Sequence, residues 1–277
     1  MKYCVAAALA SLALSTPAFA QDEPTSPITV SGSVALVSDY RFRGVSQSDE
    51  EMAIQGGITV SHESGAYAGT WASNLAGWGM FGGSNMELDL FGGYKADLGG
   101  ATLDVGVTWY MYPGGSDITD FAEPYVKLSS TVGPVNILGG VAYAPKQRAL
   151  GRWYIGGADN ATGTPTFPDA KDDNLYIWGD LSTAIPETPL SLRAHLGYSD
   201  GNPGLGPNGT SVTPTGSYLD WNLGADVAVG PLVLGVTYTD TDISYSDSSY
   251  LYPNFSSTKD GSTIAGGQVV FSVTAAF

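Results

Sequence analysis

The sequence predicts an all-β fold: a transmembrane antiparallel up-and-down β-barrel of about twelve strands, with short periplasmic turns and long extracellular loops. Three observations predict it. Short segments along most of the chain alternate apolar and polar residues, which is the period of an extended strand. Short and long connections alternate between these segments. The composition is rich in glycine (37) and tyrosine (16), and no apolar stretch approaches the length of a membrane-spanning helix.

Residues 1–20 have the pattern of a secretory signal peptide. Lys2 supplies the positive start, an apolar run follows at 5–14, and residues 18–20 (AFA) form a small-x-small cleavage site. We expect cleavage before Gln21, which leaves residues 21–277 as one barrel domain. The single cysteine, Cys4, lies inside the signal, so the mature chain would have no disulfide or thiolate chemistry.

The negative net charge of the chain argues against nucleic acids as partners. The formal net charge is −16 at pH 7. Nucleic-acid binding requires basic patches, so we expect no nucleic-acid partner. The same charge argues against peripheral attachment to anionic lipid.

Twelve strands are expected, each with one apolar and one polar face. In chain order they lie at 28–36, 52–60, 67–71, 86–94, 103–111, 121–129, 135–143, 175–181, 190–198, 219–227, 232–238 and 266–277. The third is short, and its apolar face is assigned to Tyr67, Gly69 and Trp71. The sixth is irregular because it contains Pro124, which cannot donate to a central ladder.

The connections divide into two classes. Tight turns are expected at 62–65, 95–100, 131–134, 184–189 and 229–231, and the longest loops at 145–172, 200–216 and 240–261. This alternation places every long loop at one end, as in outer-membrane barrels. A soluble barrel would instead bury its apolar side chains, and the polar face here is rich in charges.

Aromatic residues near the strand ends support a membrane setting. They share the parity of the apolar face, as interfacial girdles require: Tyr40, Tyr94, Trp109, Tyr143, Tyr198, Trp221 and Tyr238. The last strand ends on Phe277, with Phe271 and Val273 on the same apolar face. A terminal aromatic on an alternating strand resembles the insertion signal of bacterial outer-membrane barrels, so we expect the barrel-assembly machinery to bind this strand.

Residues 37–49, VSDYRFRGVSQSD, carry a family resemblance. They are similar to the hallmark of the TorF-like porins of proteobacteria, also known as the conserved hypothetical Gcw-type outer-membrane proteins. The motif residues are Ser38, Asp39, Tyr40, Arg41, Arg43 and Gly44. The signal peptide, the Gly- and Tyr-rich strands and the terminal Phe277 agree with the same family. The resemblance implies a porin-type barrel and little mechanism.

Continuing the parity of the first strand predicts that the motif lines a pore. Asp39, Arg41 and Arg43 would face the lumen, and Tyr40 and Phe42 would face lipid. The other predicted pore-lining residues are Glu87, Asp89, Asp104, Glu123, Lys127, Asp180, Arg193, Asp220 and Asp226. These are eight acids and four bases, a lumen charge of about −4, and walls of both signs suit a water-filled channel.

Enzymatic and metal chemistry are weaker hypotheses. Twelve-stranded outer-membrane phospholipases use a His with a Ser nucleophile, but His62 lies at a periplasmic turn and His195 faces the lumen without a serine at a suitable spacing. Two groups of loop acids could bind Ca²⁺ or bridge lipopolysaccharide through divalent ions, but they lack EF-hand or repeat spacing and are expected to be solvated: Asp169, Asp172 and Asp173, and Asp240, Asp242 and Asp247. We therefore predict no catalytic residue, no metal and no cofactor.

The sequence thus predicts an outer-membrane channel for passive diffusion of small hydrophilic solutes or ions, weakly cation-preferring. Its surroundings would be outer-membrane lipid and lipopolysaccharide. The alternative is a closed structural or surface-interaction barrel that acts through its acidic extracellular loops.

Overall fold

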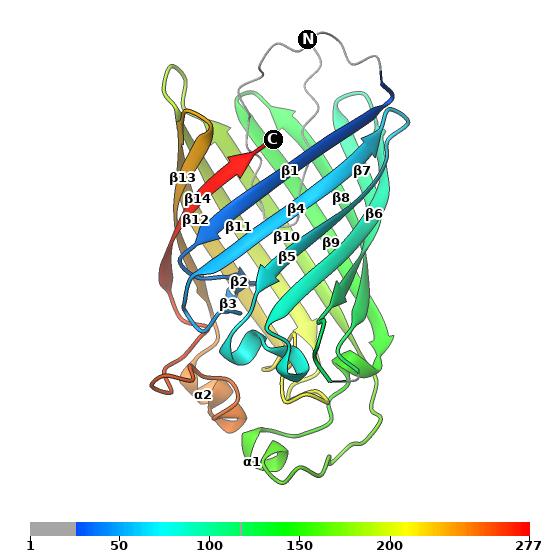
Figure 1. The fold of residues 1–277 in the computed structure, drawn as a ribbon, viewed down its shortest axis with the longest axis vertical. Coiled ribbons are helices and arrows are strands. Elements are labelled where there is room, and N and C mark those ends of the chain that lie inside the picture. Colours follow the sequence, from blue (N-terminus) through cyan, green and yellow to red (C-terminus); the bar gives the residue numbers. More distant parts are fainter. Residues whose placement is uncertain (1–25, 117) are drawn as a thin grey trace.

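The computed structural model describes residues 26–116 and 118–277, so the expected signal peptide lies outside the described residues. Twelve antiparallel strands close into one barrel, as predicted (Figure 1). They are β1 (Ile28–Val37), β4 (Ala53–His62), β5 (Ala66–Asn74), β6 (Met86–Asp97), β7 (Ala101–Met111), β8 (Phe121–Val132), β9 (Val135–Gln147), β10 (Asp172–Ala184), β11 (Leu190–Gly201), β12 (Ser217–Val229), β13 (Leu232–Thr241) and β14 (Gln268–Ala276).

The barrel closes where β14 pairs with β1. Their register runs from Ser33 opposite Ala276 to Val37 opposite Ser272. Beyond it, Gly32 N donates to Phe277 O at 2.8 Å, and Phe277 N donates to Gly32 O at 2.9 Å. At the other end of the seam, Phe271 N donates to Ser38 Oγ at 2.9 Å. The first and last strands therefore leave no open edge, as a barrel in lipid requires.

The connections alternate as predicted. Short turns join β4 to β5, β6 to β7, β8 to β9, β10 to β11 and β12 to β13, and all of them lie at the end where β1 begins and β14 ends (Figure 1). The long connections lie at the opposite end. They contain the only helices of the described residues: η1 (Gly77–Gly79), η2 (Phe81–Gly83), η3 (Arg148–Leu150), α1 (Gly157–Asn160), α2 (Tyr245–Ser248) and η4 (Ser249–Leu251).

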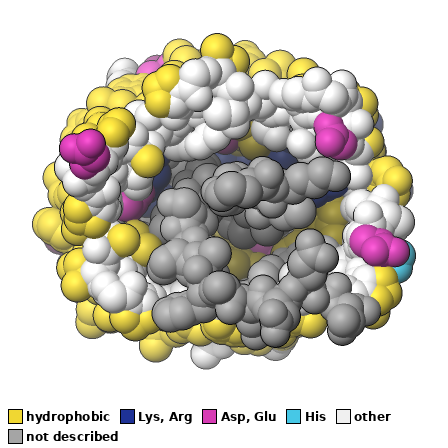
Figure 2. All heavy atoms as spheres, turned by 90° about the horizontal axis from the view of Figure 1, so that it is seen from above, with side chains coloured by type: hydrophobic (Ala, Val, Ile, Leu, Met, Phe, Trp, Pro, Cys, Tyr) yellow, Lys and Arg dark blue, Asp and Glu magenta, His cyan; other side chains and the backbone are white. Residues whose placement is uncertain are grey.

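The outer surface of the barrel is apolar. Predicted outward residues such as Ile54, Leu196 and Leu223 are 57–66% exposed. The aromatic residues Tyr94, Trp109, Tyr143, Tyr198 and Tyr238 are exposed as well, as an interfacial girdle requires. Seen from the short-turn end, hydrophobic side chains surround the barrel (Figure 2). Within residues 26–116 and 118–277, no helix is long and apolar enough to span a membrane.

The predicted facing of β5 is wrong. Tyr67 points inward, because its hydroxyl donates to Asp104 on β7, and Trp71 packs inside the barrel against Tyr40. The outward positions of this strand are small, with Ala66 and Ala68 exposed to the outside. In β5 the large aromatic residues therefore face the lumen and the small residues face outward, the opposite of the facing that was predicted.

The proline in β8 lies at the point where a ladder ends. The Pro124 side chain is exposed on the outer face. The pairing of β8 with β9 begins only at the next residue, Tyr125. On the other side of Pro124, the Gln147 side chain takes the place of a strand partner for the backbone of Ala122. Its Oε1 accepts from Ala122 N and its Nε2 donates to Ala122 O, both at 2.8 Å. The strand therefore continues past a residue that lacks a donor.

Inward-facing glycines make room for large side chains. A Cβ at Gly140 would overlap the Trp178 indole, and one at Gly106 would lie 2.5 Å from the Tyr125 hydroxyl. A Cβ at Gly224 would lie 2.7 Å from the Arg193 guanidinium carbon. The side chains of Trp178, Tyr125 and Arg193 therefore occupy the space beside glycines of the neighbouring strands.

The neighbouring glycines of β9 provide a test. Gly140→Ala should destabilise the barrel by about 1–3 kcal/mol, because the Trp178 indole must move. Gly139→Ala is the matched control, since a Cβ there meets nothing within 4 Å, and it should change stability by less than about 0.5 kcal/mol. Urea unfolding in detergent, followed by tryptophan fluorescence, measures both. Equal effects of the two substitutions would contradict this packing.

Candidate functional site in the barrel lumen

The motif at 38–49 forms a hairpin inside the barrel. β1 ends at Val37, and the chain then turns inward to form β2 (Arg41–Phe42) and β3 (Val45–Ser46) (Figure 1). The two residues between them, Arg43 and Gly44, both have positive φ, 48° and 80°, as in a type I′ hairpin turn. A Cβ at Gly44 would overlap the Thr241 side chain of the wall, so this position also requires glycine for space.

Asp39 holds the hairpin together. Its carboxylate accepts from Arg41 Nε at 2.5 Å, from Ser46 Oγ at 2.6 Å and from Ser48 Oγ at 3.1 Å. Arg41 is thereby fixed, and it donates further to Glu50 and to the carbonyls of Gly44, Ile264 and Gly266. The guanidinium of Arg41 therefore joins the hairpin to the segment that precedes β14, and charge-assisted bonds of this kind are among the strongest.

Arg43 joins the tip of the hairpin to the opposite wall. Its Nη2 lies 2.7 Å from Glu123 Oε1 on β8, and its Nη1 donates to Asn174 Oδ1 on β10 at 2.6 Å. Its guanidinium carbon also lies 4.1 Å from the ring centre of Tyr176. The side chains of Arg43 and Glu123 are only 5% and 4% exposed. The tip of the hairpin is thus held across the lumen by a buried ion pair.

The prediction that Tyr40 and Phe42 face lipid is wrong. Tyr40 is buried, donates to Glu87 on β6 at 3.1 Å and packs edge-on against Trp71 at 5.4 Å. Phe42 packs edge-on against Tyr110 of β7 at 5.8 Å. The strand parity does not continue into the motif, because β1 ends at Val37 and both faces of the hairpin lie inside the barrel.

The other predicted lumen charges lie on the inner wall, mostly in pairs. Lys127 Nζ lies 3.9 Å from Asp104, and Arg193 Nε lies 2.9 Å from Asp226. His195, the predicted inward histidine, is held by three side chains of the wall. Its Nδ1 lies 2.6 Å from Asp180, and its Nε2 lies 2.8 Å from the Tyr176 hydroxyl and 3.2 Å from Asp220.

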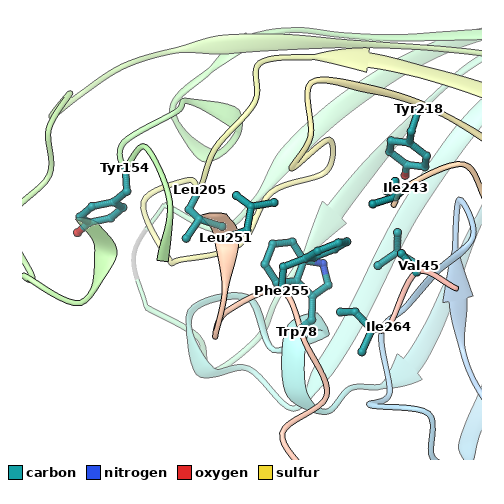
Figure 3. Close-up of a cluster of buried hydrophobic side chains, with 10 residues drawn as sticks. Val45, Trp78, Tyr154, Leu205, Tyr218, Ile243, Leu251, Phe255 and Ile264 are labelled. Carbon is teal, nitrogen blue, oxygen red and sulfur yellow. The ribbon is translucent and has the colours of Figure 1, made fainter. Parts of the chain in front are cut away.

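The loop end of the barrel is covered by an apolar cluster, which we call the mouth cluster (Figure 3). It contains Val45 of the hairpin and residues of the long loops and the wall: Trp78, Tyr154, Leu205, Tyr218, Ile243, Leu251, Phe255, Ile264 and Ala265. Trp78 and Phe255 come from loops far apart in sequence and pack edge-on, with ring centres 4.8 Å apart. A cavity of about 10 Å³ beneath it, lined by Val45 and Trp78, has room for roughly one water.

Several residues that face the lumen were not predicted from the sequence. Lys95 was assigned to a turn, but β6 continues to Asp97 and the Lys95 ammonium lies 5.1 Å from the Tyr67 ring centre. Tyr125 and Tyr176 also face inward. Extending the parity of β6 and β8 would have found Lys95 and Tyr125. Nothing in the sequence shows that residues 38–49 leave the wall.

The loop acids considered as Ca²⁺ ligands take part in local bonds. Asp172 accepts from Arg152 N, and Asp173 accepts from the Tyr143 hydroxyl. Asp247 forms a capping box with Ser244 at the start of α2. Across residues 26–116 and 118–277, no group of three His, Cys, Asp or Glu side chains has the spacing of a metal site.

Comparison with known proteins identifies the family. Residues 21–277 match the model of Gcw_chp, described as a bacterial protein of unknown function. The chain belongs to the Gcw_chp family. The predicted likeness to Gcw-type proteins is therefore confirmed, and the finer likeness to TorF-like porins stays a prediction. No curated protein matches the chain.

This Gcw_chp member is similar to several solved structures at low sequence identity. A structure from work on the in-meso crystallization of membrane proteins has a TM-score of 0.49 at 9% identity, over 90% of this chain and 83% of that chain. A porin has a TM-score of 0.40 at 10% identity, over 90% and 100%. The outer-membrane channel DcaP of Acinetobacter baumannii has a TM-score of 0.42 at 9% identity, over 90% and 97%.

The buried pair of Arg43 and Glu123 can be tested by substitution. Arg43→Met should destabilise the protein by about 3–5 kcal/mol, because it leaves Glu123 buried without a counter-charge. Adding Glu123→Gln should recover part of the loss. The measurement is the midpoint of urea unfolding in detergent.

Arg148→Met is the matched control for this test. Arg148 pairs with Asp169 on the surface, where the side chains are 43% and 73% exposed, so its loss should cost less than about 1 kcal/mol. If Arg43→Met and Arg148→Met had equal effects, the hairpin would not be anchored by this pair.

Proposed function

We propose that the protein is an outer-membrane channel for small hydrophilic solutes or ions, with a preference for cations. The observation that carries the proposal is a charged inner wall inside an apolar exterior (Figure 2). Besides His195, eight acids and five lysine or arginine bases lie on the lumen side, so the acids outnumber the Lys and Arg side chains by three. The acids are Asp39, Glu87, Asp89, Asp104, Glu123, Asp180, Asp220 and Asp226, and the bases are Arg41, Arg43, Lys95, Lys127 and Arg193. Such a wall replaces part of the hydration of an ion and biases which ion enters.

The hairpin at 41–46 is the proposed constriction of this channel. It occupies the lumen near the loop end and is held by Asp39, Arg41 and Arg43. The mouth cluster lies beyond it. Conduction therefore requires the hairpin or the loops to move from the positions that this structure shows, and charged groups released by that movement would face the ion path.

A closed barrel that acts through its loops is the second candidate. The mouth cluster favours it, because ten buried apolar residues cover the loop end of the lumen. In that case the acidic loops would bind a partner outside the cell, and the lumen charges would serve only to pair with one another.

The membrane setting and the assembly route belong to the same proposal. Phe271, Val273 and Phe277 are 41–73% exposed on the outer face of the last strand, where the barrel-assembly machinery would bind them. Lipid and lipopolysaccharide would surround the apolar exterior. We propose no catalytic role for His195, since three wall side chains hold its ring.

Reversal potentials in planar bilayers test the cation preference. With KCl asymmetric across the membrane, the wild type should show an open level whose reversal potential favours K⁺. Arg41→Ala and Arg43→Ala should each deepen that preference, because each removes a positive charge from the lumen. Arg148→Ala removes an equal charge from the surface and should leave the preference unchanged. A silent bilayer from a folded, heat-modifiable barrel would overturn the channel proposal.

Shortening the hairpin tests the constriction. Tyr40 O accepts from Gln47 N at 2.7 Å, so residues 41–46 can be replaced by the tight turn Asn-Gly without breaking that pair. The single-channel conductance should then rise, because the lumen widens. Deletion of residues 162–165 in the exposed β9–β10 loop is the control and should leave conductance unchanged. If the shortened protein and the wild type had equal conductance, the hairpin would not limit ion flow.

A further inference from the structure

One region of the inner wall carries buried oxygen atoms without partners. Asp89 on β6 is 2% exposed, and its Oδ1 has no hydrogen-bond partner among residues 26–116 and 118–277. Thr108 on β7 is 1% exposed, and its Oγ1 has no partner in this described part of the chain either. Buried polar atoms are almost always hydrogen-bonded in folded proteins, and an exception requires a physical reason. Two such atoms on adjacent strands indicate a shared reason.

The two side chains face the same part of the lumen. In the ladder, Asp89 is opposite Tyr110 and Thr108 is opposite Phe91, so Asp89 and Thr108 are diagonal neighbours on adjacent strands. Their sequence neighbours Leu90 and Trp109 are 44% and 50% exposed on the outer face. Since successive side chains point to opposite faces, Asp89 and Thr108 both point into the barrel.

The same region has an excess of negative charge. Glu87 precedes Asp89 by two residues on β6, and Glu123 is opposite Thr108 in the ladder with β8. Both glutamates are 3% exposed. Arg43 neutralises Glu123, whereas within the described ranges Glu87 accepts only from the Tyr40 hydroxyl. A buried carboxylate without a counter-charge is strongly disfavoured, so this wall favours the binding of a proton or of a cation.

We propose that the Asp89 carboxylate and the Thr108 hydroxyl form a binding site for a monovalent cation, Na⁺ or K⁺. Both groups present hard oxygen ligands, which suit such ions. The carboxylates do not converge as a divalent cage would, since no group of three acidic or histidine side chains within the described ranges has metal-site spacing. A partly hydrated ion with few protein ligands binds weakly enough to leave again, as conduction requires.

The site lies next to the hairpin. Phe42 packs on Tyr110, which is the ladder partner of Asp89, and Tyr40 bonds to Glu87. A cation bound at Asp89 therefore reduces repulsion among the acids against which the hairpin packs. This inference rests on the proposed function for its role in ion passage, but the site itself requires only the folded barrel.

Thermal unfolding in different cations tests the site without measuring conduction. The purified barrel is heated in detergent at constant ionic strength in NaCl, in KCl or in the chloride of N-methyl-D-glucamine, an ion too large for the site. The wild type should unfold about 2–4 °C higher in NaCl or KCl, because an ion that binds only the folded state stabilises it. Asp89→Asn and Thr108→Val should each abolish or reduce this difference.

The stability of the variants in the large cation separates a binding role from a structural one. Asp89→Asn removes an unpaired buried charge, so in N-methyl-D-glucamine it should unfold at or above the wild-type temperature. Asp97→Asn, on the same strand but exposed, is the control and should keep the wild-type response to Na⁺ and K⁺.

Three results would overturn the proposal: a wild type indifferent to the cation, an Asp89→Asn variant that is less stable in every cation, or a response to micromolar Ca²⁺ that Na⁺ and K⁺ do not share. A silent bilayer together with a cation response that depends on Asp89 would instead refute the channel and leave the site in place.

Discussion

Closure of the backbone ladder is the constraint on which the rest of this structure depends. In a lipid environment the N–H and C=O groups of an open sheet edge have no partner, and each unpaired group costs several kcal/mol. β1 and β14 remove both edges by pairing with each other, and the ladder extends through Gly32 and Phe277 at one end and Ser38 at the other. Ser38 is thus the last residue of the seam and the first residue of the inward hairpin.

Twelve strands enclose a narrow lumen, and its contents follow from that width. Large side chains such as Trp178 and Tyr125 fit because glycines stand beside them on the neighbouring strands. Most of the charged groups inside lie beside groups of opposite charge. The hairpin supplies many of these partners through Arg41, Arg43 and Tyr40. The hairpin therefore stabilises the half of the barrel nearest the long loops through its polar contacts, and it is also the proposed constriction of the channel.

The lumen charges are not satisfied uniformly. His195, Arg193 and Lys127 each lie beside an acid of the wall, and Arg43 is bonded to two wall side chains. Asp89 has no such partner among the residues that the structure describes, although it is as deeply buried as the others. A wall that pairs most of its charges but leaves Glu87 and Asp89 of β6 without a counter-charge concentrates the cation preference in one region. Diffuse negative charge alone would attract cations without holding one.

The sequence alone determined the wall of this barrel. Period-two alternation placed Glu87, Asp104, Glu123 and Asp226 on the inner face, because a strand in a closed sheet must send successive side chains to opposite sides. The same rule failed at Tyr67 and Trp71, since in β5 the small residues face outward and the large ones face the lumen.

Only the tertiary structure decided the course of residues 38–49. Locally VSDYRFRG could continue a strand, with Tyr40 and Phe42 in lipid. The inward hairpin is stabilised instead by contacts far away in sequence, above all Arg43 with Glu123 and Asn174, and Arg41 with the carbonyls of Ile264 and Gly266. The unpartnered state of Asp89 could not be foreseen for the same reason. Parity predicts the face to which a side chain points, but its partners depend on how distant strands and loops meet inside the closed barrel.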